Sequence, residues 1–181
     1  MAKTHSRLRT TVRDMVLTMA LIVVPILLVI WLMPANAPKN VVTPVSNADY
    51  QAMLTAARSE LPFTAMSPTG LPASWELTSD TYEPAGDAAA DWHLGYQTEA
   101  GKYAEFEQTT ESIAQFLDDQ HSDATRHGTV TAAGQQWQSY AGTTPGGLKT
   151  LLFRQDGKSL EVVAGSASLA ELETLAGSLQ S

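Results

Sequence analysis

Apolar and polar positions divide the chain into one long apolar run and a following region of shorter, periodic segments. The run Met15–Met33 holds no charged residue and a single proline, Pro25. A helix of these 19 residues is about 28 Å long, which matches the ~30 Å hydrocarbon core of a bilayer. Membrane helices tolerate a proline with a kink, and Trp31 lies where an aromatic ring suits the interface. The pattern therefore predicts one transmembrane helix over residues 15–33.

Charge is distributed unevenly along the chain. Four basic residues lie just before the apolar run: Lys3, Arg7, Arg9 and Arg13. Residues 1–33 carry a net charge of +3, whereas the rest of the chain carries −11. The positive-inside rule then predicts a cytoplasmic N-terminus of residues 1–14, a single pass through the cell membrane, and an extracytoplasmic C-terminal domain.

A cleaved signal peptide is the alternative interpretation of the same segment. Ala35-Asn36-Ala37 has the A-x-A form of a signal-peptidase site, and a basic and an apolar region precede it. The apolar run is longer than the ~7–15 residues usual in signal peptides, which favours a retained anchor. Both interpretations place the domain outside the cytoplasm, and cleavage after Ala37 is left open.

Behind the membrane segment, residues 34–46 contain three prolines and little periodicity, which is typical of a semi-extended stalk. We expect the folded domain at residues 47–181. Apolar residues at helical spacing predict a first helix over 48–61, with Asn47 as its N-cap. The proline- and glycine-rich stretch Pro62–Pro72 is predicted to be a loop.

Two further helices and a series of strands are predicted in the rest of the domain. One helix is expected at Glu111–Gln120 with Thr110 as its cap, and the last follows Ser168, where Glu171 completes a capping box. Alternating apolar positions predict strands at Trp75–Tyr82, Trp92–Thr98, Lys102–Thr109, Thr129–Ala132, Gln135–Ala141, Leu148–Gln155 and Ser159–Ala164. Asp156-Gly157 between two apolar runs is the strongest hairpin signal among them.

The order of these elements defines the expected fold class. Runs of strands interrupted by helices, rather than strict alternation, indicate the α+β class. We therefore predict a single N-terminal transmembrane helix followed by an antiparallel sheet of about six or seven strands covered by helices. The order is analogous to that of Mog1/PsbP-like folds, which is a likeness of fold alone.

A set of short motifs resembles a known family. The motifs are Arg13-Asp14-Met15, Pro68-Thr69-Gly70-Leu71-Pro72 before Trp75, Trp92-His93-Leu94-Gly95-Tyr96, Gly101-Lys102-Tyr103 and Gln108. Together with the single span they are similar to an actinobacterial family of membrane-anchored proteins, designated a domain of unknown function (number 4245). The resemblance covers most of the chain and implies an actinobacterial envelope protein, but it implies no catalytic or binding residue.

One cluster combines the side chains that a metal site needs. Its imidazoles and carboxylates suit zinc or manganese and belong to Asp118, Asp119, His121, Asp123 and His127. Their spacing matches no metal-binding motif, and the polar end of a helix gathers charged residues in any case. A solvated helix end is therefore the favoured interpretation, and no metal ligand is assigned.

Other chemistry has weaker signals. Glu105 and Glu107 lie on one strand face, as a carboxylate pair for glycoside hydrolysis would, but a solvent-facing side is favoured for them and for His93. The sequence contains no G-x-S-x-G elbow and no phosphate-binding glycine loop. Six aromatic residues are expected in the core rather than in a ligand groove: Trp75, Trp92, Trp137, Tyr96, Tyr103 and Phe106. We predict no enzyme activity, no catalytic residue and no cofactor.

Composition narrows the function further. The chain has no cysteine, which excludes disulfides, thiol nucleophiles and a lipidated cysteine, and its net charge of −8 argues against nucleic acid as a partner. A lone span with a short stalk predicts an accessory subunit of a larger membrane complex, with the lipid bilayer and integral membrane proteins as partners. Actinobacterial respiratory supercomplexes of the cytochrome bcc–aa3 type carry small subunits of this layout and are the candidate host. The alternative is an envelope lipid- or small-molecule-binding domain.

Overall fold

The computed structural model describes residues 44–86, 88–121, 123–144 and 147–181, which belong to one compact unit, Val42–Ser181. The predicted cytoplasmic N-terminus, the predicted membrane segment 15–33 and most of the predicted stalk lie outside these residues. Within the described part of the chain, no helix is both long and apolar enough to cross a membrane.

Three helices cap themselves with serine side chains. Helix α2 spans Asn47–Glu60 and α4 spans Leu169–Ser178. The N-cap of α2 is Ser46, whose Oγ accepts the Asp49 N–H, so the prediction of Asn47 as the cap was wrong by one residue. Helix α4 has the predicted capping box, because the Ser168 side chain and the N3 glutamate satisfy each other's backbone N–H groups.

Helix α3 begins later than the sequence pattern indicated. It spans Ile113–Gln120, and its N-cap is Ser112 rather than Thr110. Ser112 and Gln115 form a capping box, whereas Thr110 uses its Oγ1 to accept the Ala90 N–H. A hydroxyl that is bonded to a neighbouring segment is not available to cap a helix, which explains the shift.

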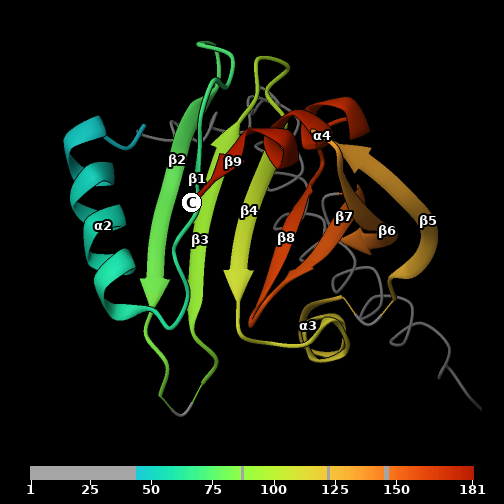
Figure 1. Cartoon of the computed structure of the whole chain (residues 1–181). Helices are drawn as coiled ribbons and strands as arrows, with labels where there is room; N and C mark the ends of the chain where they lie inside the picture. Colours follow the sequence, from blue (N-terminus) through green and yellow to red (C-terminus); the bar gives the residue numbers. More distant parts are fainter. Residues whose placement is uncertain (1–43, 87, 122, 145–146) are drawn as a thin grey trace, which may run out of the picture. The chain divides into compact units, whose positions relative to one another are not determined.

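An antiparallel sheet of seven strands forms the centre of the described residues (Figure 1), so the α+β prediction is confirmed. Its strands are β2 (Glu76–Glu83), β3 (Asp91–Gln97), β4 (Tyr103–Thr109), β5 (Thr125–Ala132), β6 (Gln135–Thr144), β7 (Gly147–Asp156) and β8 (Ser159–Gly165). The order across the sheet is β2-β3-β4-β8-β7-β6-β5. The sheet therefore joins two meanders, β2 to β4 and β5 to β8, through the pairing of β4 with β8.

Turn chemistry predicted the hairpins correctly. Asp156 pairs with Ser159, and Gly157 has a φ of 57°, which a glycine adopts without strain. The predicted loop 62–72, in contrast, contains a short strand β1 (Ser67–Pro68), which pairs with β9 (Leu179–Gln180) beside the C-terminus. Two-residue strands are too short to leave a periodic pattern in a sequence.

The two faces of the sheet are covered differently. On one face, side chains of α2 and α4 pack with Trp92, Phe106 and Leu152 in the larger core cluster. In Figure 1, α4 and the β1–β9 pair cross in front of this face, which we call the helix face. On the opposite face, Phe116 of α3 packs in a second cluster with buried residues of β7 and β8. The β2–β4 part of this second face, which we call the open face, has no helix among the described residues packed over it.

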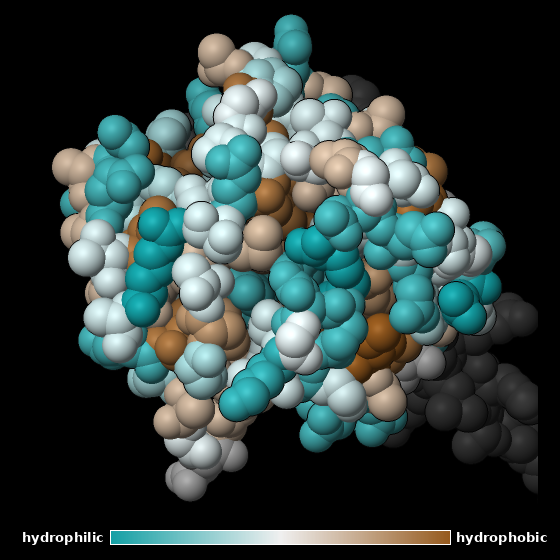
Figure 2. Space-filling model, viewed as in Figure 1, coloured by the Kyte–Doolittle hydropathy of each residue, from teal (hydrophilic) through white to brown (hydrophobic). Residues whose placement is uncertain are grey.

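Figure 2 shows the surface from the side of the helix face. Apolar patches there are small and are separated by hydrophilic residues. In the described residues, Tyr103 and Leu169 are the large apolar side chains that are exposed, at 38% and 42%. Isolated exposed apolar residues of this kind do not indicate an apolar ligand or membrane surface.

Candidate functional site

A row of side chains crosses the helix face, one from each strand, and becomes polar in its middle. Strand pairing places Tyr82, Trp92, Gln108, Glu161 and Arg154 in successive register. The Arg154 guanidinium then lies over the Trp137 ring at 5.1 Å, and Trp137 pairs with Val130 on the edge strand. The middle of this row consists of Gln108, Glu161 and Arg154, and buried polar groups such as these need hydrogen-bond partners.

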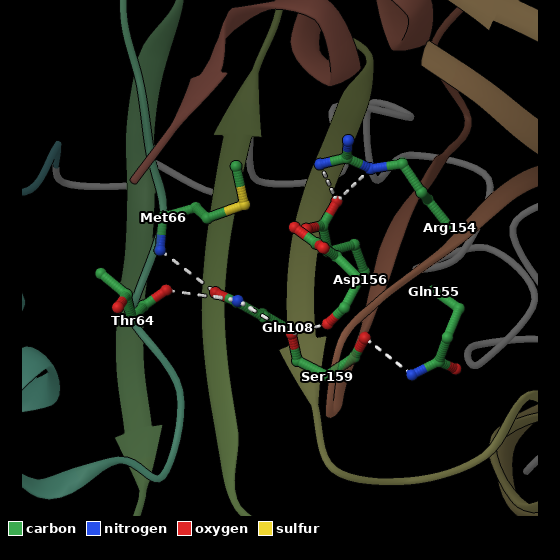
Figure 3. Close-up of polar contacts among 8 residues, drawn as sticks. Thr64, Met66, Gln108, Arg154, Gln155, Asp156 and Ser159 are labelled. Carbon is green, nitrogen blue, oxygen red and sulfur yellow. Dashed lines mark hydrogen bonds and ion pairs between the residues drawn. The ribbon is translucent and has the colours of Figure 1, made fainter.

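Gln108 and Trp92 hold the segment between α2 and β1 against the sheet, and Figure 3 shows the contacts of Gln108. The Gln108 Oε1 accepts the Met66 N–H at 3.1 Å, and the Trp92 Nε1–H donates to the Met66 carbonyl at 2.8 Å. The Gln108 amide nitrogen donates to the Thr64 carbonyl and to Ser159 Oγ. The Gln108 side chain is only 3% exposed, and it serves as an anchor for a segment that lacks regular structure.

Glu161 and Arg154 form an ion pair at the next position of the row. Two guanidinium nitrogens contact Glu161 Oε2, at 2.6 Å from Nε and 2.5 Å from the terminal nitrogen. The Glu161 side chain is fully buried, and its Oε1 has no hydrogen-bond partner in the described residues. Burial raises the pKa of Glu161 above its usual range, and the Arg154 guanidinium opposes this shift. Removal of either partner would therefore lower the free energy of unfolding, because the other charge would be left buried and unpaired.

Two shallow cavities flank this row beside the C-terminus. One, of about 370 Å³, is lined by Phe63, Gln108 and Lys158 among others. The other, of about 480 Å³, is lined by Arg154 and by Gly177 at the end of α4. Both are open to solvent. Apart from Glu161 Oε1, the buried polar groups of Gln108 and Glu161 have partners within the chain, so these residues build the fold around the cavities.

The open face carries a second polar group of residues, centred on His93. Its Nε2 lies 3.3 Å from Ser79 Oγ and 3.3 Å from Tyr103 Oη. Gly95 lies beneath this cluster, where a Cβ would collide with Ser79 Oγ and would lie 2.8 Å from Tyr103 Oη. Burial lowers the pKa of His93. His93 lies on the face opposite Trp92, as expected, but it is half-buried rather than fully solvated, because Ser79 and Tyr103 contact its ring.

A line of charged groups continues from this cluster toward α3. Glu105 binds Lys149 Nζ at 2.6 Å, and Lys149 in turn donates to His121 Nε2 at 3.4 Å. His121 is 7% exposed, and burial together with the Lys149 charge lowers its pKa. A neutral imidazole that accepts a hydrogen bond from an ammonium group fits this shift.

Asp91 and Glu107 form a carboxyl pair on the same face. Burial and the neighbouring carboxylates raise the pKa of Asp91 to about 7 and that of Glu107 to about 8. Glu83 and Glu111 add further negative charge, and a cavity of about 350 Å³ lies against Asp91, Glu111 and His93. Glu105 and Glu107 do share one strand face as predicted, but Glu105 binds Lys149 and both side chains are partly buried rather than freely solvated.

The candidate metal residues do not come together. His121 lies at the end of α3, whereas His127 lies on the exposed strand β5, and Asp123 accepts the Thr143 N–H at 2.7 Å. Across the part of the chain that the structure describes, no three histidine or carboxylate side chains are arranged to hold a metal ion. Burial of His121 shows that this helix end is not simply solvated.

The aromatic residues follow the core prediction with one exception. Trp92, Trp137 and Phe106 are fully buried, Tyr96 is 6% exposed, and the partly buried Trp75 packs against Tyr96 with ring centroids 6.3 Å apart. Tyr103 is the exception, because it belongs to the open face and is 38% exposed.

The fold and these two polar regions define a class: a small α+β protein whose antiparallel sheet has one filled face and one open, polar face. The chain belongs to a family described as a protein of unknown function (DUF4245), whose model matches residues 7–179. No curated protein matches the chain. His93, Gly95, Tyr103 and Gln108, which carried the resemblance in the sequence, all have specific contacts in the two polar regions.

Proposed function

We propose that this protein is a non-enzymatic accessory subunit of a larger membrane complex and that the open face is a docking surface. The observation that carries this proposal is the partly buried excess of carboxylates on β2, β3 and β4, which no described helix covers. Five acidic residues lie on or beside this face, Glu83, Asp91, Glu105, Glu107 and Glu111, and Lys149 lies beside them as the neutralising cation.

Electrostatics favours a basic partner for this face. The raised pKa values of Asp91 and Glu107 mean that ionisation of this pair is unfavourable in the isolated domain. Arginine or lysine side chains of a partner would stabilise the ionised form and would recover that free energy on binding. Binding would therefore release protons, and the affinity for the partner would rise between pH 6 and pH 8.

Binding of a small molecule is the second candidate function. It is favoured by the cavity of about 350 Å³ beside Asp91 and Glu111. Its acidic lining suits a cationic or hydroxylated molecule better than a lipid chain, because apolar ligands require apolar walls. On the helix face, Trp92, Leu94 and Phe106 are fully buried and fill the space that a lipid pocket would occupy.

Location belongs to the same proposal. We propose that residues 15–33 form one transmembrane helix, that the N-terminus is cytoplasmic, and that the described domain is extracytoplasmic in the cell membrane. We also propose that the fold is analogous to Mog1/PsbP-like folds. The candidate host complex is an actinobacterial cytochrome bcc–aa3 supercomplex. Alkaline phosphatase fused after Ser181 should be active; an inactive fusion together with an active cytoplasmic reporter at that site would refute the orientation.

Affinity purification tests the subunit proposal directly. A tag after the exposed Ser181 of the full chain, with mild detergent and mass spectrometry, should yield integral membrane partners in stoichiometric amounts. The double variant Asp91→Asn/Glu107→Gln should reduce partner recovery at least tenfold at pH 8. A control with the same change of charge at exposed positions, Glu99→Gln/Asp118→Asn, should recover the partner as the wild type does. If the wild type migrates alone, the subunit proposal fails and ligand binding becomes the leading candidate.

A further inference from the structure

The two edges of the seven-stranded sheet differ in how they are protected. The β2 edge has charged side chains, among them Glu76 and Asp80, and a register shift between Leu77 and Ser79. The Val45 N–H also donates to the Leu77 carbonyl at 2.9 Å, and α2 packs beside this strand. Charges, irregular register and covering segments are the devices by which natural sheets prevent unwanted pairing at an edge.

The β5 edge has less of this protection, although α4 contacts the strand. Six of the eight residues of Thr125–Ala132 are exposed, and Arg126 is the charged residue among them. One register shift lies between Arg126 and Gly128, and the stretch from Gly128 to Ala132 then pairs regularly with β6. In the described residues, β6 is the one strand that pairs with β5, and no other backbone hydrogen bond reaches it from outside the sheet.

Such an edge presents backbone N–H and C=O groups that only another extended chain can satisfy regularly. We propose that β5 is a docking edge, at which an extended segment of the membrane partner adds to the sheet as an eighth strand. This inference rests on the proposed function, because it assumes a partner in the membrane complex.

Charge and side-chain pattern specify that segment further. Residues 124–144 contain Arg126 and no carboxylate, although the chain as a whole is acidic. The partner's added strand therefore carries a carboxylate where it passes Arg126 and lacks basic residues there. Thr129 and Thr131 project from one face of β5 and Val130 from the other, so β-branched residues opposite them would form favourable cross-strand pairs. A second copy of this chain is disfavoured as the occupant, because two strongly acidic domains repel each other.

The test places charges on the edge without disturbing the core. Thr129 and Thr131 are exposed, so the variant Thr129→Lys/Thr131→Lys keeps the fold and adds the edge lysines that block strand addition. The control Gln51→Lys/Thr55→Lys makes the same change of charge at exposed positions of α2. Each full-length chain is tagged after Ser181 and purified in mild detergent from membranes of its source. Hydrogen exchange of the β5 amides is measured in the wild-type complex and after high-salt release.

Partner recovery should fall at least tenfold for the β5 variant and stay at the wild-type level for the control. The β5 amides should exchange at least tenfold more slowly in the complex than after release, whereas the β2 amides should not change. If both variants recover the partner equally and β5 exchange is unaltered, the edge proposal is overturned and the subunit proposal stands. If the wild-type chain purifies as a monomer without a partner, both proposals fail. If it purifies as a homodimer that the β5 lysines dissociate, the edge binds a second copy, and the proposed partner segment is refuted.

Discussion

Replacement of Arg154 by methionine tests the account of the buried ion pair. Methionine keeps much of the arginine volume but leaves the Glu161 carboxylate, which is fully buried, without its cation. Breaking a buried pair in this way costs about 3–5 kcal/mol of unfolding free energy, because the remaining charge is neither solvated nor paired. Since domains of this size are stable by about 5–15 kcal/mol, the variant should lose a large part of its stability.

The assay is urea unfolding of the full chain in detergent, followed by tryptophan fluorescence, because Trp92 and Trp137 are fully buried. With a slope of about 2 kcal/mol per molar urea, the Arg154→Met midpoint should fall by about 2 M at pH 8. The loss should be smaller at pH 5. Arg154 normally opposes the raised pKa of Glu161, so without it the carboxyl is protonated over a wider pH range.

Two further variants make the test decisive. The double variant Arg154→Met/Glu161→Leu removes both charges and should lie within about 1 kcal/mol of the wild type or above it. Lys158→Met removes an exposed cation from the same hairpin and should change stability by no more than about 0.5 kcal/mol. A cost below about 1 kcal/mol for Arg154→Met, or a double variant as unstable as the single one, would refute this reasoning.

Other perturbations test the open face and the smaller core cluster. Burial raises the pKa of Asp91 to about 7 and that of Glu107 to about 8. The stability that these two groups contribute is therefore complete below pH ~4 and is lost as the pH rises through 7–8. Urea midpoints should fall from pH 5 to pH 9, and Asp91→Asn/Glu107→Gln should remove this pH dependence. Gly95→Ala should cost about 1–3 kcal/mol through collision with the serine and tyrosine hydroxyls, whereas Gly86→Ala, which has open space around it, should be neutral in the same measurement. Phe116→Ala should cost about 3–5 kcal/mol by thermal or urea unfolding, since the ring is 1% exposed; a loss below 1 kcal/mol would contradict the assignment of α3 to the core.

Local patterns predicted most of the helices and strands. One polar contact, between Arg154 and Glu161, could also have been predicted from them. A two-residue turn after Asp156 pairs that residue with Ser159, and the same register places Arg154 opposite Glu161. A glutamate in an otherwise apolar strand therefore had an identifiable partner in the sequence. The periodicity of a single strand assigns no partner to its side chains, so this contact was not predicted.

Contacts between distant segments had no such signal. The position of Lys149 beside Glu105 depends on β4 lying next to β8, and no periodicity encodes that order. The Gln108 side chain meets Met66 across 42 residues of sequence, in a segment without regular structure. The helix starts failed for a different reason: Ser46 precedes Asn47, and both residues have good capping propensity, so only the observed hydrogen bond decides between them.

The junction of β4 and β8 has a consequence for biosynthesis. Thr109 pairs with Leu160, so the sheet closes only after about 50 intervening residues have been made. Each meander consists of neighbouring hairpins and can form early, but their union must wait until β8 has emerged from the ribosome. Closing a loop of this length slows the final step relative to local pairing. Until then the inward sides of both meanders remain exposed, and during this interval the nascent protein is most susceptible to proteolysis and most in need of a chaperone.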